Sequence, residues 1–307
     1  MNIRFVDVTV GNVWLNPEKP RTLDAPSLSR PADIPEWLRR LDCDEKGRIG
    51  LIGRLETQVL YGEPVWVVAE RDGWAEVRVP DQFSSKDESG YPGWMPVQQL
   101  TFHPDYHQAW RTEPLAHIIV RRTRLRLEGC KTELSIGFMS KLPWLGEMDG
   151  EAIVLTPRGT VGRLPAEHIS VARSLPVAGG EIRAATAERF LGLPYLWGGT
   201  SSCGYDCSGL MYRLFESAGI RIPRDAGDQA CYGKRVEKEE LLPGDLVFFA
   251  DNKGRGKVHH VGMYVGNGAF LHSPRTGHPV RIDRLSAETY AQEFCAARRY
   301  DGSEIFP

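Results

Sequence analysis

The sequence predicts a multidomain protein in which an all-β part precedes an α+β part. Gly and Pro, 32 and 21 of the 307 residues, punctuate short alternating runs in the N-terminal part, where a short motif also recurs. Farther along, the pattern changes to helices followed by strands. We therefore expect two small β barrels over residues 1–110 and 111–176, an insertion near 84–92 in the first, and an α+β domain over 177–307.

A hairpin and an internal repeat support the two barrels. Alternating apolar residues on both sides of Asp72-Gly73 predict the hairpin. Gly93–Leu100 (GWMPVQQL) matches Gly162–Ile169 (GRLPAEHI) at an offset of 69, whereas the hairpin turn matches Asp149-Gly150 at an offset of 77. The first copy is therefore eight residues longer, and the excess is the polar insertion, a place where function concentrates.

Charge and hydropathy exclude two classes of partner. Lys and Arg number 38 and Asp and Glu number 40, so the net charge is −2 and no basic stripe indicates nucleic-acid binding. The apolar runs are far shorter than the ~20 residues of a membrane span. The first residues alternate apolar with polar side chains, so with Met1 as the native start we expect no secretory signal and a cytoplasmic protein. Six irregularly spaced cysteines indicate reduced thiols.

Helical spacing and alternation predict the elements of the C-terminal part. A helix over 181–191 would turn Ile182, Ala185 and Phe190 to one face, and a second over 207–218 would end at Gly219. The expected strands are 245–250, 260–265, 269–273, 280–283 and 293–300.

Cys207 is the candidate nucleophile. It falls in the first turn of the second predicted helix, where Asp206 is placed to cap the N-terminus. A helix N-terminus and an imidazolium neighbour lower the pKa of a thiol from ~8.5, so we expect a thiolate there. An isolated Cys is more often a small buried apolar residue, and that alternative stays open on Cys207 alone.

Two histidines downstream favour the chemical interpretation. If Gly266–Gly268 is a three-residue loop, His272 lies opposite Gly262 and diagonally beside His260, on the same face of a hairpin. One ring can then act as base while the second fixes its tautomer and orientation. A two-residue turn would place His272 on the other face, so this inference depends on the turn.

A zinc site is the competing interpretation. Cys203, Cys207 and histidines could supply ligands, but no second cysteine pair matches the first, and one helix-start Cys with two strand histidines suits nucleophilic catalysis better. We therefore predict no metal and no cofactor. The remaining histidines are expected to be structural: His103, His107, His117, His168, His259 and His278.

Five sequence blocks in the C-terminal part together resemble the NlpC/p60 family of papain-like cysteine peptidases. They are LGLPYLWGG (191–199), GYDCSGL (204–210), LPGDLVFF (242–249), HVGMYVG (260–266) and FLHS (270–273). The resemblance implies Cys207 as nucleophile, His260 as general base and His272 as orienting residue. It also implies cleavage between the γ-carboxyl of D-Glu and diaminopimelate or Lys in cell-wall peptides.

The whole sequence is similar to a narrower group, the γ-D-glutamyl-L-diamino acid endopeptidases with two bacterial SH3-like modules. Those enzymes recycle murein peptides and require a free N-terminal L-Ala, which implies murein tri- and tetrapeptides as substrates. By this resemblance Tyr91 would cap the cleft, and Glu56 would meet the substrate ammonium with Asp206, since a buried ammonium needs carboxylate partners. Glu56 and Tyr91 fit equally well as a solvated acid and a barrel aromatic.

The same resemblance places Tyr195 and Ser208 along the cleft. Tyr195 also joins the Cys207 backbone N–H as a candidate oxyanion donor. Ala226 stands where the resemblance leads us to expect Ser, which puts one substrate hydrogen bond in doubt.

Two other functions are compatible with the sequence. The protein could be a secreted hydrolase of intact peptidoglycan, or a wall-binding SH3-like protein with an inactive peptidase domain. Because Cys207, His260 and His272 are all present, the inactive alternative is disfavoured. Nothing in the sequence predicts an obligate protein partner.

Overall fold

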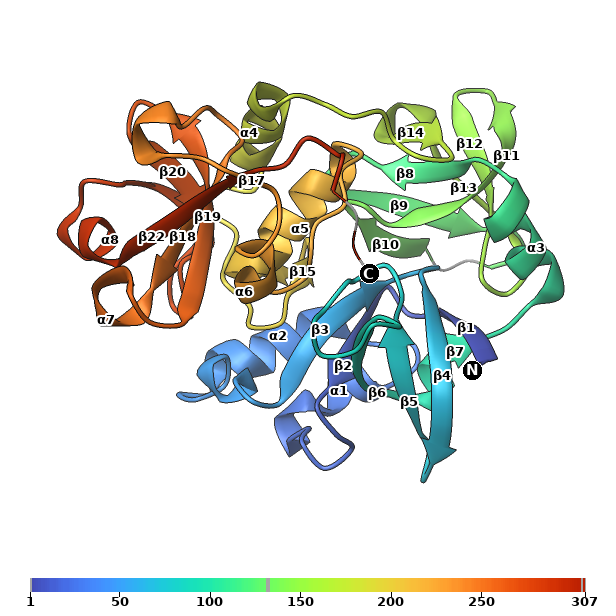
Figure 1. Cartoon of the computed structure of the whole chain (residues 1–307). Helices are drawn as coiled ribbons and strands as arrows, with labels where there is room; N and C mark the ends of the chain where they lie inside the picture. The colour runs from blue at the N-terminus through green and yellow to red at the C-terminus, as the bar shows by residue number, and fades with distance from the viewer. Residues whose placement is uncertain (1, 131–132, 305, 307) are drawn as a thin grey trace. The chain divides into compact units, whose positions relative to one another are not determined.

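The computed structural model describes residues 2–130, 133–304 and 306 (Figure 1). The chain forms two compact units. Residues 1–81, 89–175 and 201–203 make up the N-terminal unit, and residues 82–88, 176–200 and 204–307 make up the C-terminal unit. Except for residues 82–88 and 176, both expected barrel ranges fall in the N-terminal unit, and most of the expected insertion belongs to the C-terminal unit.

The N-terminal unit holds two antiparallel sheets of seven strands each among the described residues. The first, in the order β3-β2-β6-β5-β4-β1-β7, contains β1 (Asn2–Val6), β2 (Val10–Trp14), β3 (Leu55–Leu60), β4 (Pro64–Arg71), β5 (Trp74–Val79), β6 (Tyr91–Pro96) and β7 (Leu100–Thr101). The second, in the order β10-β9-β13-β12-β11-β8-β14, contains β8 (Leu115–Ile118), β9 (Arg122–Leu127), β10 (Glu133–Gly137), β11 (Lys141–Met148), β12 (Glu151–Leu155), β13 (Val161–Pro165) and β14 (Ile169–Ala172).

The internal repeat is confirmed at the level of strand order, because the two sheets are identical once each is numbered from its own first strand. The aligned turns also agree. Asp72 and Gly73 have φ values of 50° and 79°, and Asp149 and Gly150 have 54° and 75°. Two successive left-handed residues make the turn type that matches the twist of a two-residue hairpin.

The N-terminal unit is not all-β, which corrects the sequence prediction. It contains the helices α1 (Ala25–Leu28), α2 (Ile34–Cys43) and α3 (Pro104–Thr112), and the 3₁₀ turns η1 (Thr22–Asp24), η2 (Ile49–Leu51), η3 (Val97–Gln99) and η4 (Ala166–His168). At the start of α2, the Asp33 side chain accepts a hydrogen bond from Glu36 N at 3.0 Å. Ile34, Trp37 and Leu41 bury one stripe of that helix.

The C-terminal unit is α+β, as expected, with a six-stranded antiparallel sheet in the order β17-β22-β18-β19-β20-β21. The strands in this part of the chain are β15 (Thr200–Ser201) and β16 (Gly204–Tyr205), which form a separate two-stranded sheet, and β17 (Lys234–Arg235), β18 (Leu246–Ala250), β19 (Val258–Gly266), β20 (Ala269–His272), β21 (Arg281–Arg284) and β22 (Phe294–Arg299). Its helices are α4 (Gly180–Glu188), α5 (Cys207–Ser217), α6 (Ala226–Gln229), α7 (Asp251–Gly254), α8 (Glu288–Glu293) and the 3₁₀ turn η5 (Lys238–Glu240). The helices α4 and α5 pack against β19 (Figure 1).

The start of α5 was predicted correctly, but the buried face of α4 is not the one that was predicted. α5 begins at Cys207 and buries Leu210, Met211, Leu214 and Phe215, and Gly219 follows with φ +68°. In α4, by contrast, Ile182 is 61% exposed and Ala185 is also exposed, whereas Phe190, just beyond the end of α4, is buried as expected.

The inward face of α4 is unusual because it contains an arginine. Arg183, Ala184 and Ala187 are the buried residues of this helix. The Arg183 guanidinium lies 4.5 Å from the centre of the Phe215 ring and donates to Ala178 O at 2.7 Å, so both a cation–π contact and a hydrogen bond hold it inside the unit. None of the helices in the described part of the chain has the length and apolar character needed to cross a bilayer.

Candidate active site

Cys207 is the first residue of α5 and lies half-buried beside β19. The helix is capped as predicted, since the Asp206 side chain accepts a hydrogen bond from Gly209 N at 2.6 Å. Backbone hydrogen bonds from Val261 and Ser208 reach the Cys207 thiol. Because Val261 directly follows His260 in β19, the thiol and the predicted base come from adjoining elements of one unit.

The predicted register between His260 and His272 is confirmed, although the turn is not the one expected. Met263 pairs with Leu271, which places His272 opposite Gly262. The loop has two residues, Asn267 and Gly268, with φ values of 51° and 70°. A bulge between Tyr264 and Gly266 supplies the additional residue that brings His272 back to the required face.

Gly262 is required between the two rings. A Cβ at Gly262 would lie 3.1 Å from the Cβ of His272 and 2.6 Å from Cδ2 of Phe270. The absence of a side chain therefore lets the diagonal pair of histidines meet across the hairpin.

The two histidines form a hydrogen-bonded series that ends on a carboxylate. His260 Nε2 lies 2.7 Å from His272 Nδ1, and His272 Nε2 lies 3.0 Å from Oδ2 of Asp283 on β21. His260 is 6% exposed and His272 is fully buried. This series leaves Nδ1 of His260 as the ring nitrogen available for proton exchange with a thiol.

Burial favours the neutral form of both imidazoles. It lowers the pKa of His260 well below its usual range, and the neighbouring His272 lowers it further. Burial also lowers the pKa of His272 to about 4, although the hydrogen bond and charge of Asp283 act in the opposite direction. A neutral His260 at physiological pH has the protonation state of a general base.

The surroundings of Cys207 oppose the expected thiolate. Burial and the negative charge of Asp206 raise the pKa of the Cys207 thiol to about 12, although backbone hydrogen bonds from Val261 and Ser208 and the charge of Arg224 lower it. A helix N-terminus and an imidazolium would favour the thiolate, but burial favours the neutral form of His260. Both shifts favour a thiol beside a neutral imidazole at rest, with the proton leaving Cys207 as the nucleophile attacks.

A buried arginine that the sequence analysis did not single out holds the residues on both sides of Cys207. The fully buried Arg224 donates from Nη2 to Asp206 Oδ2 at 2.7 Å and from Nη1 to Ser208 Oγ at 2.9 Å. Gln229 Nε2 adds a bond to the carbonyl of Ser208 at 3.1 Å. The signal in the sequence was the PRD segment around Arg224, but an arginine is seldom fully buried and its pairing with Asp206 follows from the tertiary fold.

Asp206 and Ser208 therefore face inward toward Arg224 as well as lying next to the nucleophile. Both oxygens of Asp206 accept hydrogen bonds from Arg224, at 3.2 and 2.7 Å, and Ser208 Oγ lies 3.2 Å from Asp206 Oδ1. Tyr195 belongs to the same cluster. Burial raises the pKa of its hydroxyl well above the usual value, with further contributions from Cys207 and Asp206.

Glu56 and Tyr91 lie in the N-terminal unit and contact each other. Tyr91 Oη donates to Glu56 Oε2 at 3.4 Å. Glu56 is the additional residue of a bulge in β3, because Val13 pairs with Thr57 and Trp14 pairs with Leu55. A bulge redirects a side chain out of the regular alternation, and here it brings the carboxylate to the tyrosine. Their role toward a substrate stays a prediction.

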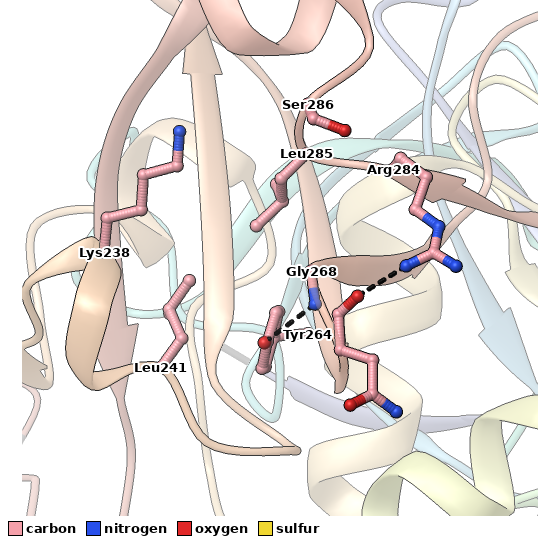
Figure 2. Close-up of a pocket in the computed structure, with 8 residues that line it drawn as sticks. Lys238, Leu241, Tyr264, Gly268, Arg284, Leu285 and Ser286 are labelled. Carbon is pink, nitrogen blue, oxygen red and sulfur yellow. Dashed lines mark hydrogen bonds between the residues drawn. The ribbon is translucent and has the colours of Figure 1, made fainter.

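Among residues 2–130, 133–304 and 306, no group of three His, Cys, Asp or Glu side chains is arranged to hold a metal ion. A pocket of about 230 Å³ in the C-terminal unit contains Lys238 and Arg284 but none of the predicted site residues (Figure 2). All six cysteines are free thiols.

Comparison with known proteins decides the family. The profile of the NlpC/P60 family matches residues 192–299, and that of the bacterial dipeptidyl-peptidase Sh3 domain matches residues 53–100. A curated relative from Bacillus subtilis (strain 168), a gamma-D-glutamyl-L-lysine dipeptidyl-peptidase, is 41% identical over 94% of this chain and 96% of its own. The chain belongs to the NlpC/P60 family. It is a cysteine peptidase with an SH3-like domain.

Two further curated relatives and one crystal structure are similar to this chain over different lengths. A protein of the same name from Bacillus cereus (strain ATCC 10987) is 38% identical over 96% of this chain and 90% of its own. The crystal structure of an NlpC/P60 family protein from Bacillus cereus ATCC 10987 has a TM-score of 0.94 and 37% identity, covering 98% of this chain and all of the other. Murein DD-endopeptidase MepH of Escherichia coli (strain K12) is 47% identical but matches only 36% of this chain and 41% of its own.

Proposed function

We propose that this NlpC/P60 peptidase hydrolyses the bond between the γ-carboxyl of D-Glu and a diamino acid, Lys or diaminopimelate, in murein peptides with a free N-terminal L-Ala. The observation that carries the proposal is the whole-chain likeness to two gamma-D-glutamyl-L-lysine dipeptidyl-peptidases. The peptidase domain alone would not suffice, because it is also similar to an enzyme named for a different bond. The natural setting we propose is the recycling of tri- and tetrapeptides released from the wall.

The proposed mechanism begins with an uncharged pair. Cys207 attacks the γ-amide carbonyl while His260 accepts the thiol proton at Nδ1, and His272 holds the His260 ring through the 2.7 Å bond. The Cys207 backbone N–H at the start of α5 and the Tyr195 hydroxyl would stabilise the oxyanion. His260 then protonates the departing amine, and later removes a proton from the water that hydrolyses the thioester.

Recognition of the free amine is proposed for Glu56, Tyr91 and Asp206. An ammonium group that leaves water needs an anionic partner, and an acylated amine cannot supply the charge. Support comes from the hydrogen bond between Tyr91 and Glu56 and from the bulge that redirects Glu56. Asp206 already neutralises Arg224, so we assign the larger share of the recognition to Glu56. Tyr195 and Ser208 are proposed to contact the substrate next to the nucleophile.

The second seven-stranded sheet is proposed to be a second SH3-like module. The family profile for such a domain matches residues 53–100, within the first sheet. Support for the second comes from the identical strand order and the matching turns at Asp72-Gly73 and Asp149-Gly150.

A paired-substrate assay tests the proposal. The purified protein is incubated with L-Ala-γ-D-Glu-L-Lys, with the diaminopimelate analogue and with the N-acetylated form of each, and products are separated by mass-detected chromatography. We expect release of L-Ala-γ-D-Glu from the free-amine peptides only. Equal cleavage of the acetylated peptides would refute amine recognition, and activity on intact sacculi would favour the alternative of a wall hydrolase.

A further inference from the structure

The structure extends the catalytic series by one residue, Asp283 on β21. In the pairing of β20 with β21, His272 lies opposite Arg281 and Phe270 lies opposite Asp283. Asp283 is therefore the diagonal neighbour of His272 on the same face, and its Oδ2 lies 3.0 Å from His272 Nε2. None of the sequence blocks named above contains this residue.

The carboxylate of Asp283 sets the direction of both hydrogen bonds. An ionised carboxylate only accepts, so His272 must carry its proton on Nε2. A neutral His272 then has a lone pair on Nδ1, and His260 must donate to it from Nε2. His260 is left with an unprotonated Nδ1, the nitrogen that has to accept the thiol proton.

Several donors keep Asp283 ionised and fixed in place. Arg281 donates from Nε and Nη2 to Oδ2 at 2.9 and 2.8 Å, and Tyr290 Oη of α8 donates to the same oxygen at 3.1 Å. Although burial raises the pKa of Asp283, the bonds from Arg281 and His272 bring it below its usual value. His278 lies beside Arg281, with Nδ1 at 3.3 Å from Nη1.

We propose that Asp283 is a positioning residue that fixes the tautomers of His272 and His260, so that His260 presents an unprotonated Nδ1 to the nucleophile. This inference rests on the proposed function, because it assigns the base for that reaction. A carboxylate behind an imidazole also stabilises the cation that forms when the proton arrives, as in other triads. Here the stabilisation passes through a second ring.

Two substitutions and one spectroscopic readout test the inference. In Asp283→Ala we expect kcat for L-Ala-γ-D-Glu-L-Lys to fall ~10–100-fold with little change in KM, as for other residues that orient a ligand or base from behind. In Asp283→Asn the amide oxygen still accepts from His272, so we expect a smaller loss. Glu239→Ala, which removes an exposed carboxylate from the same unit, is the control and should retain full activity.

The ¹⁵N NMR spectrum of histidine-labelled protein reads the tautomers directly and needs no substrate. We expect Nε2–H on both His260 and His272 in the wild type and in Asp283→Asn, and a mixture of tautomers in Asp283→Ala. Unchanged tautomers and unchanged kcat in Asp283→Ala would overturn the inference. The inference would also be overturned if Asp283→Ala lost activity only in proportion to its loss of folded protein while Asp283→Asn kept full activity and wild-type spectra. If the wild type cleaves none of the peptides, the proposed function fails while the tautomer assignment is still decided by NMR.

Discussion

The two halves of the active site are built on different physical principles. On the thiol side, defined here as Asp206, Cys207, Ser208, Arg224 and Gln229, a helix cap and a buried ion pair fix the nucleophile between its two neighbours. On the imidazole side, defined here as His260, His272 and Asp283, a linear series of hydrogen bonds fixes where each proton resides.

The difference separates control of position from control of the proton. The thiol side holds Cys207 in place and does not ionise it, since burial and Asp206 raise the pKa of the thiol to about 12. The imidazole side provides a neutral acceptor, since burial lowers the pKa of His260 well below its usual range. Each half therefore supplies what the other lacks, and substitutions in the two halves should have different consequences.

The largest effect is expected for removal of the nucleophile. Cys207→Ala should lower kcat by at least ~10⁴-fold, because the covalent route is lost, while the protein remains folded. The change deletes one sulfur at the start of α5 and leaves the Asp206 cap and the Arg224 pair intact. Peptide turnover and thermal melting of the same preparation measure both. Activity near that of the wild type would show that another residue is the nucleophile.

Breaking the ion pair of the thiol side should reduce stability as well as activity. Arg224→Met leaves Asp206 buried without its cation, which we expect to cost about 4 kcal/mol of unfolding free energy. Urea denaturation measures the change.

The matched control for Arg224→Met is Arg235→Met. That residue forms an exposed ion pair with Glu237, its side chain being 76% exposed, and should change stability by less than about 1 kcal/mol. Equal effects of the two substitutions would contradict the structural role given to Arg224.

The imidazole side should make the free energy of unfolding depend on pH. The pKa of His272 in the folded protein is about 4, below the usual 6.5. Between these values the unfolded chain binds a proton that the folded protein does not, so unfolding free energy should fall as pH is lowered from 6.5 to 4. The contribution of His272 is at most about 3 kcal/mol.

Denaturant titrations at several pH values measure this slope. His272→Gln, which cannot protonate, should show a shallower decrease than the wild type over the same interval. An identical decrease in both proteins would mean that His272 is not held neutral by the fold.

The smallest effect is expected for selectivity toward the free amine, which we assign to Tyr91 and Glu56, outside both the thiol side and the imidazole side. Tyr91→Phe removes the hydroxyl that donates to Glu56 at 3.4 Å, and we expect KM for free-amine peptides to rise a few-fold, equivalent to about 1 kcal/mol, with kcat unchanged. Thr160→Val is the control. Thr160 takes the place of Tyr91 at the 69-residue offset in the second sheet and bonds Thr156 at 2.7 Å. Equal KM changes in both variants would leave Tyr91 without a substrate role.

The elements around the nucleophile could be predicted because their signals are local. Helical spacing places Leu210 and Leu214 on one face of α5, and strand alternation puts His260 and Gly262 together. Even the register of His272 was right, although the bulge that creates it was not foreseen. A three-residue loop without a bulge and a two-residue loop with a one-residue bulge both place His272 opposite Gly262. The sequence could not distinguish these two arrangements.

The missing parts of the site depend on tertiary packing. Asp283 is one of many carboxylates on strands, and only its pairing with β20 shows that it meets His272. Arg224 is separated from Asp206 by the whole of α5, and its burial could not be read from local composition. The raised pKa of Cys207 has the same origin, because desolvation depends on what covers a residue and not on its neighbours in sequence.

The most direct test of the central claim is to trap the acyl-enzyme. The protein is mixed with L-Ala-γ-D-Glu-L-Lys, quenched in acid within a turnover, digested and examined by mass spectrometry. The account predicts a peptide containing Cys207 that is heavier by one L-Ala-γ-D-Glu acyl group, absent from Cys207→Ala. An acyl group on any other residue, or rapid cleavage by Cys207→Ala, would contradict it.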